Sequence, residues 1–209
     1  MKAIKINLSL LISVFFSLSV IAQTNNSSTD NVIRKKMFLD VHHLGQGNVT
    51  AGAVAAAHQK DLNTQLKYGV QFIKYWVDTT RGDVYCLSSA ANSSSVTNTH
   101  AEAHGLIPDE VFTVIEGTEA TMLGGKNLYL DIHELGPGNV SDADVATAHQ
   151  KDLAVQKKHG VNFLNYWVDT KKGFVFCLSE ANDSLDVIQT HRDAHGLLPN
   201  YILRVEEGK

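Results

Sequence analysis

The chain contains the same module twice, and this duplication limits its fold more than any other feature. When the 209-residue sequence is shifted by 91 positions it aligns with itself without a gap, and about 44 of the 81 residue pairs between 37–117 and 128–208 are identical. Two copies are too few for a solenoid, whose core needs at least three stacked repeats. A copy of about 80 residues is long enough to bury a small core. We therefore predict a signal peptide, a flexible tether, a first module, a linker and a second module, over residues 1–22, 23–35, 36–117, 118–126 and 127–208.

The first 22 residues resemble a secretory signal peptide. Lys2 and Lys5 give a positive start, and the apolar stretch that follows over 8–21 is too short to span a bilayer comfortably. Ala22 supplies the small residue expected before a cleavage site. A retained N-terminal anchor is the alternative. The pattern predicts an exported protein, periplasmic or secreted, with no membrane attachment after cleavage.

Each module shows the order strand, helix, strand, strand, helix, strand. Apolar alternation and helix-capping residues place these elements in the first module at about 37–42, 50–67, 70–78, 83–88, 93–105 and 111–115. This order is the ferredoxin-like pattern, an α+β fold in which both helices cover one face of a four-stranded antiparallel sheet. The predicted fold is therefore two tandem ferredoxin-like (βαββαβ) modules.

The other face of each sheet needs a cover. Leu39 and Val41 alternate with Phe38, Asp40 and His42 along the first strand, and we expect the latter three on the face without helices. Two such faces in one chain can pack together, which predicts an intramolecular pseudo-dimer in a monomeric protein. Two independent modules on a short linker are the alternative.

Ten histidines are unusual in a chain of this length, and eight of them recur at equivalent positions in the two modules. His42 and Asp40 are two residues apart on one strand, and Cys86 lies on the neighbouring strand, so their side chains are expected on one face. Imidazole, carboxylate and thiolate together can bind a borderline transition metal such as nickel or zinc. The alternative is a hydrogen-bonded polar interface with a small buried thiol.

A second group of histidines lies on the predicted helices. His58 belongs to the apolar stripe of the first helix, where Asp61 could orient its ring, and His100 and His104 are four residues apart on the second helix. These rings can chelate one ion, or they can be buried neutral side chains that bind backbone carbonyls or carboxylates. The equivalent candidates of both groups in the second module are Asp131, His133, His149, Cys177, His191 and His195.

The two cysteines occupy equivalent positions, one in each module. Two cysteines cannot form a disulfide framework. Cys86 and Cys177 are each expected to be free or metal-bound, and a single disulfide between them across the pseudo-twofold axis is the less favoured alternative.

Composition and motifs exclude several functions. The 22 acidic residues outnumber the 18 basic ones, for a net charge of −4, and no basic run suggests nucleic acid as a partner. The sequence contains no Gly-x-Ser-x-Gly elbow, phosphate-binding loop, dinucleotide fingerprint or His-Glu-x-x-His motif. These absences argue against the common hydrolase and nucleotide-dependent enzyme classes.

Five short motifs occur in the same order in both modules. In the first module they are Leu-Asp-Val-His, Ala-His-Gln-Lys-Asp-Leu, Tyr-Trp-Val-Asp, Val-Tyr-Cys-Leu and His-x-x-Ala-His-Gly-Leu, over residues 39–42, 57–62, 75–78, 84–87 and 100–106. Together they are similar to the small bacterial nickel-binding proteins of domain-of-unknown-function family 4242. The resemblance implies a ferredoxin-like fold, paired modules and nickel binding by at least some members. The family positions carried here are Asp40, His42, His58, Cys86, His100 and His104, with Asp131, His133, His149, Cys177, His191 and His195.

The sequence therefore predicts an exported, non-catalytic protein that binds a divalent metal ion, with Ni²⁺ favoured over Zn²⁺ or Cu²⁺. One alternative is an enzyme with acid–base chemistry on a small organic substrate, in a cavity lined by His58, Tyr75 and His100. Another is a metal-free interaction or stress-response module in which the histidines only pack in the core.

Overall fold

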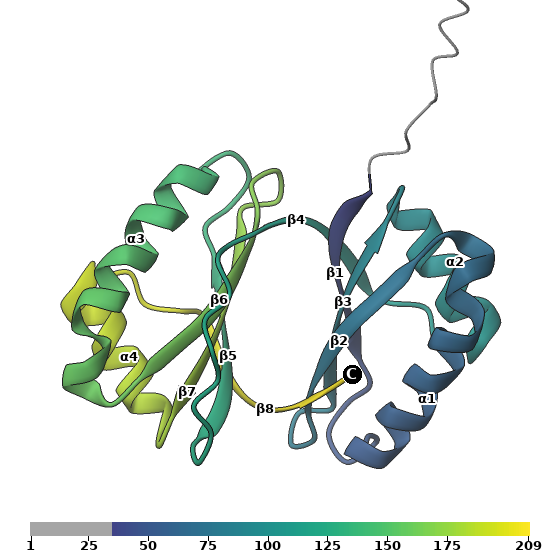
Figure 1. Ribbon diagram of the computed structural model, residues 1–209, viewed down its shortest axis with the longest axis horizontal. Helices are drawn as coiled ribbons and strands as arrows, with labels where there is room; N and C mark the ends of the chain where they lie inside the picture. The colour runs from purple at the N-terminus through teal and green to yellow at the C-terminus, as the bar shows by residue number, and fades with distance from the viewer. Residues whose placement is uncertain (1–34) are drawn as a thin grey trace, which may run out of the picture. The chain divides into compact units, whose positions relative to one another are not determined.

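The computed structural model describes residues 35–209, so the signal peptide and all but the last residue of the tether lie outside the described part. The first module comprises β1 (Lys36–His43), α1 (Ala51–Thr64), the 3₁₀ helix η1 (Gln65–Tyr68), β2 (Gln71–Asp78), β3 (Asp83–Ala90), α2 (Ser93–Ala103) and β4 (Glu110–Glu116). The second comprises β5 (Asn127–Glu134), α3 (Asp142–Val155), the 3₁₀ helix η2 (Gln156–His159), β6 (Asn162–Asp169), β7 (Phe174–Ala181), α4 (Ser184–Ala194) and β8 (Tyr201–Gly208). The predicted α+β class and the βαββαβ order in each module are confirmed (Figure 1).

The eight strands form one closed antiparallel barrel in the order β1-β3-β2-β8-β5-β7-β6-β4. The last strand of each module joins the two halves. Strand β4 pairs with β1 of its own module and with β6 of the other, where Glu116 lies opposite Trp167. Strand β8 likewise pairs with β5 and with β2, where Gly208 lies opposite Tyr75. The two modules therefore share a hydrogen-bonded sheet and are not independent.

An apolar core fills the space between the two modules. It is built from one face of every strand, and Leu39, Leu87, Leu130 and Leu203 are all at most 2% exposed. Burial of such side chains is the main favourable term in folding. This core explains why both modules are needed for either sheet to be covered on its inner face.

Phe38, Asp40 and His42 do not lie on this inner face. Phe38 packs with Val54 of α1 and Val96 of α2, in a core between the sheet and its helices. The prediction that these three residues occupy the face without helices is therefore wrong. The inner face takes the uniformly apolar positions, and the polar positions of β1 turn to the helices, which carry polar partners for them.

Hydroxyl side chains cap the first helix of each module. The hydroxyl of Thr50 accepts a hydrogen bond from the amide of Ala53 and begins α1. Ser141 and Asp144 form a capping box at the start of α3. Among residues 35–209, every helix is too short or too polar to cross a membrane.

Candidate metal centre

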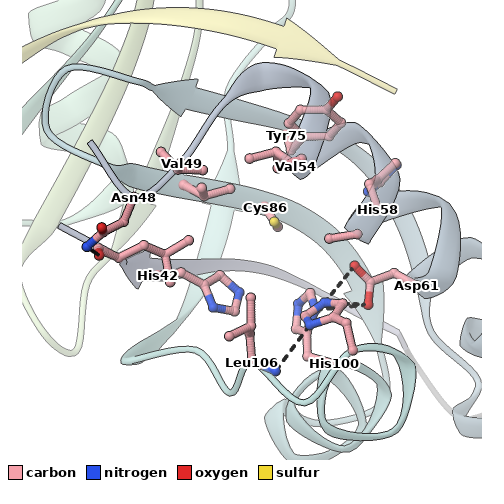
Figure 2. Close-up of a pocket in the computed structure, with 15 residues that line it drawn as sticks. His42, Asn48, Val49, Val54, His58, Asp61, Tyr75, Cys86, His100 and Leu106 are labelled. Carbon is pink, nitrogen blue, oxygen red and sulfur yellow. Dashed lines mark hydrogen bonds and ion pairs between the residues drawn. The ribbon is translucent and has the colours of Figure 1, made fainter. Parts of the chain in front are cut away.

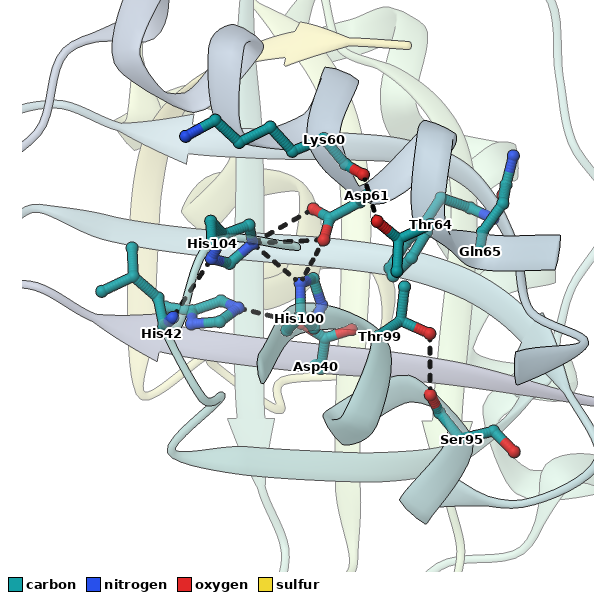
Figure 3. A network of polar contacts seen from close by, with 12 residues as sticks. Asp40, His42, Lys60, Asp61, Thr64, Gln65, Ser95, Thr99, His100 and His104 are labelled. Carbon is teal, nitrogen blue, oxygen red and sulfur yellow. Dashed lines mark hydrogen bonds and ion pairs between the residues drawn. The ribbon is translucent and has the colours of Figure 1, made fainter. Parts of the chain in front are cut away.

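A buried cluster of polar side chains lies between the sheet and the helices of the first module (Figure 3). Strand β1 supplies two of its members, β3 and α1 one each, and the last turn of α2 two. The strand group and the helix group expected from the sequence therefore meet in one place. The members are Asp40, His42, Asp61, Cys86, His100 and His104.

The carboxylate of Asp40 is at the centre of the cluster and is 0% exposed. Its Oδ1 atom lies 3.4 Å from Nε2 of His42 and 3.3 Å from Nε2 of His100. Neither oxygen makes a hydrogen bond of acceptable geometry to any described residue. An unsatisfied buried polar group costs about 1–3 kcal/mol, and more when it is charged. The imidazoles of His42 and His100 are therefore placed to neutralise the charge of Asp40 when one of them is protonated.

The ring of His100 bridges two carboxylates. Its Nδ1 atom lies 3.0 Å from Oδ1 of Asp61, and its Nε2 atom faces Asp40. Burial alone lowers the pKa of His100, but its close polar contacts and charge interactions with both aspartates outweigh this effect and raise the pKa to about 10. Burial raises the pKa of Asp40 and Asp61, but their contacts with the histidines bring it below the usual value. Without a metal, a charged His100 is the cation between the two carboxylates.

His104 is oriented by the chain that follows it. The amide of Leu106 donates a hydrogen bond to Nδ1 of His104 at 3.2 Å. In the neutral ring the proton is therefore on Nε2, which lies 3.2 Å from Oδ1 of Asp61. Ligation through Nε2 would require the proton to move to Nδ1 and the hydrogen bond from Leu106 to break, so in this conformation His104 contacts Asp61, and Asp61 contacts His100.

The remaining donor atoms fit a divalent metal ion. His42, His100, Asp40 and Cys86 each offer one atom, and these atoms lie within 4.8 Å of one another. Ligands at about 2.0–2.1 Å from a tetrahedral ion are separated by about 3.4 Å, which agrees with the two distances to Asp40. Burial, with the charges of Asp40 and Asp61, raises the pKa of the Cys86 thiol well above its usual value, so a metal must displace its proton.

The second module repeats this arrangement with two differences, which are a hydrogen bond between His133 and Asp131 and the position of Cys177. Nε2 of His133 lies 3.1 Å from Oδ1 of Asp131, and Nε2 of His191 lies 3.3 Å from the same oxygen. Asp152 holds Nδ1 of His191 at 3.0 Å. The donor set that satisfies the same distance limit consists of Asp131, His133 and His191, and Cys177 falls outside it.

A second group in the first module, Asp61, His100 and His104, also has its donor atoms within 4.8 Å of one another. His58 lies beside the cluster and belongs to neither donor set. Its ring centroid is 4.9 Å from that of Tyr75 and 6.0 Å from that of Phe72. Burial lowers its pKa, which keeps the ring neutral. It lines a cavity of about 140 Å³ whose other walls include His42, His100 and Leu106 (Figure 2). His149 lines the equivalent cavity of about 190 Å³ in the second module.

Both modules match one protein family. Residues 38–114 and 129–205 each match the family described as nickel responsive protein SCO4226-like. The chain belongs to this family. The predicted family-level resemblance, in two tandem copies, is thereby confirmed.

Two solved structures illustrate the similarity of this SCO4226-like chain to known proteins. SCO4226 from Streptomyces coelicolor A3(2) is 32% identical over 37% of this chain and 93% of its own, with a TM-score of 0.35. A mutant chlorite dismutase from Candidatus Nitrospira defluvii is 7% identical over 84% of this chain and 91% of its own, with a TM-score of 0.47. No curated protein matches the chain.

The thiols of the two SCO4226-like modules are free and buried. The disulfide between Cys86 and Cys177 that the sequence left open does not form in the structure.

One polar residue of each SCO4226-like module has a different role from the one predicted. Asp61 was expected to orient His58, but it contacts His100 and His104. Its position seven residues after Val54 puts it on the same stripe of α1 as His58, and this spacing is the signal that it points inward.

Proposed function

We propose that this protein binds one divalent metal ion in each module, with Ni²⁺ as the physiological ion and Zn²⁺ or Cu²⁺ as competitors. The buried carboxylate of Asp40, which has two imidazole nitrogens at 3.3 and 3.4 Å and no hydrogen bond to a described residue, is the observation that carries this proposal. His42, His100 and Asp40 would hold the ion, with Cys86 as a fourth ligand. Asp131, His133 and His191 would hold the second ion.

The family supports the choice of nickel, because its description names a nickel response. We also propose that each module is a copy of the domain found in domain-of-unknown-function family 4242. Further parts of the proposal are that the protein is exported to the periplasm or secreted, acts without catalysis, and remains a monomer without nucleic acid or membrane as a partner. The histidines ligate as neutral rings, so binding should weaken as the pH falls, and the pKa of about 10 for His100 extends this competition with protons to neutral pH.

The test is a calorimetric titration of chelator-treated protein with Ni²⁺, Zn²⁺ and Cu²⁺, together with the metal content of the purified protein. We expect two ions per chain and one fewer in each of Asp40→Asn and Asp131→Asn. His43→Ala is a matched control, because His43 is on β1 but its ring is exposed and contacts Asp83. Absence of binding at micromolar concentrations of all three metals would overturn the proposal.

A further inference from the structure

The cavity beside the metal cluster contains a buried imidazole with no partner. His58 is 3% exposed, and neither of its ring nitrogens has a hydrogen-bond partner among residues 35–209. The ring lines the cavity of about 140 Å³ between α1 and the sheet. His149 repeats this in the second module, where it is 8% exposed and its Nδ1 atom also lacks a partner in the described chain.

The walls of the cavity select the kind of molecule that it can hold. Val49 and Val54 make one side apolar, Leu106 lies near His42 and His100, and the ring of Tyr75 packs against His58 (Figure 2). A cavity of about 150 Å³ in another protein holds one benzene molecule, so the volume here suits a single six-membered ring. The cavity also reaches Asp61 and His100, but their charges are paired with each other, so a charged ligand would bring an unpaired charge and a neutral one would not.

We propose that each module binds a small neutral organic molecule, about the size of one six-membered ring, whose hydroxyl or carbonyl group forms a hydrogen bond with His58 or His149. A neutral imidazole has one donor and one acceptor nitrogen, so it can bind either head group. The apolar body of the ligand packs against the valine and leucine side chains. His58 itself lies outside the donor sets, but the same cavity is lined by His42, Cys86 and His100, so binding is tested both with and without the metal.

The test uses 4-fluorophenol and fluorobenzene as probes. Fluorine NMR measures their binding to chelator-treated and to Ni²⁺-treated protein. The two probes differ by the hydroxyl alone. We expect 4-fluorophenol to bind about tenfold more tightly, as one recovered hydrogen bond predicts, and to do so without metal. His58→Leu with His149→Leu should remove this preference, and His58→Gln with His149→Gln should restore part of it.

Two blocking variants locate the site. Ala57 and Ala148 are equivalent residues that line the two cavities, so Ala57→Phe and Ala148→Phe should each reduce the number of bound probes from two to one. Circular dichroism and thermal melting verify that each variant folds. Equal affinity for the two probes, no binding at millimolar concentration, or unchanged stoichiometry in both blocking variants would overturn the proposal. A separate Ni²⁺ titration of the same samples reports on the metal centre, so failure of one proposal is distinguishable from failure of the other.

Discussion

Oδ1 of Asp61 lies 3.0 Å from Nδ1 of His100, on the side of the ring opposite to Asp40. This contact places the Nδ1 proton of a neutral His100 toward Asp61 and leaves Nε2 free to face the donor atoms of β1. A carboxylate behind a ligating histidine fixes its orientation and raises its basicity. In the proposed metal centre Asp61 would therefore support a ligand without contacting the ion.

The first prediction concerns this supporting carboxylate. Asp61→Asn should weaken metal binding in the first module about 10–100-fold and leave the stoichiometry at two, because the ligands themselves remain. Asp152→Asn should do the same in the second module. The measurement is a calorimetric Ni²⁺ titration, with Lys60→Ala on the exposed side of α1 as the control. An unchanged affinity in Asp61→Asn would show that the contact is only structural.

The second prediction separates the three histidines of the cluster. His42→Ala and His100→Ala should each abolish the first site, since both supply a free nitrogen beside Asp40. His104→Ala should keep the site with reduced affinity, because the amide of Leu106 occupies Nδ1 and leaves the proton on Nε2. Bound Ni²⁺ per chain after gel filtration measures this. Loss of one full ion in His104→Ala would contradict it and show that the segment after α2 rearranges to free the ring.

The third prediction is that metal binding releases protons. With a pKa of about 10, His100 carries a proton at pH 7 in the metal-free protein, and this proton must leave when Nε2 ligates. The thiol of Cys86 adds a second proton in the first module if it ligates. Asp131→Asn, which retains the first site, should release about two protons, and Asp40→Asn, which retains the second, about one. Titrations in two buffers of different ionisation enthalpy measure the release, and equal values would exclude Cys86 as a ligand.

The fourth prediction is a pH optimum in the stability of the metal-free protein. Burial raises the pKa of Asp131, but the charge of His191 and the polar contacts of Asp131 with His133 and His191 outweigh burial and lower the pKa to about 2. Stability from this group is present above its unfolded value of 3.8 and is lost as the pH falls toward 2. Burial lowers the pKa of His191, but Asp131 and Asp152 raise it to about 10, so its contribution is complete below 6.5 and is lost as the pH rises to 10.

Both contributions are complete only between pH 3.8 and 6.5. Urea unfolding of chelator-treated protein should therefore give the highest stability in this range and a decline on both sides. Addition of Ni²⁺ should move the optimum to higher pH, because the ion replaces the proton of His191. A flat profile between pH 4 and 9 would contradict the assignment of charge to this cluster.

The fifth prediction tests the junction between the modules. A Cβ atom at Gly117 would overlap the ring of Tyr166, which lies on a strand of the other module. Gly117→Ala should therefore destabilise the protein by about 1–3 kcal/mol, the usual cost of overpacking. Gly52 is in α1 and a Cβ there meets nothing within 4 Å, so Gly52→Ala should stabilise by about 0.5–1 kcal/mol. Urea unfolding of the two variants compares these effects directly.

The strand alternation correctly predicted that Asp40, His42 and Cys86 share one face, but it did not identify the face. A period of two separates the residues of a strand into two sets without saying which set the helices cover. Here both faces are buried, and the choice depends on partners from elsewhere in the chain. On the helix side, Asp40 contacts the ring of His100, which is held in turn by Asp61. Leu39, on the other face of β1, packs in the core between the modules.

The role of His104 depends on a contact that no spacing predicts. Two histidines four residues apart on a helix indicate chelation of one ion, but His104 is the residue at which α2 ends. The chain turns there, and the amide of Leu106 reaches the ring. A pattern of side chains on an ideal helix contains no information about the backbone beyond its last turn.

The pairing of β4 and β8 with strands of both modules has a consequence for the evolution of the two sites. A symmetric pair of separate chains must carry two identical sites, because every substitution appears in both copies. In this chain β4 and β8 hold the halves together at any concentration, so each half can change alone. Asp144 lines the second cavity where the first has Ala53, and Cys177 lies outside the donor set of its module whereas Cys86 belongs to that of the first. One polypeptide can thus maintain a pair of sites that differ in affinity and thereby respond over a wider range of ion concentrations.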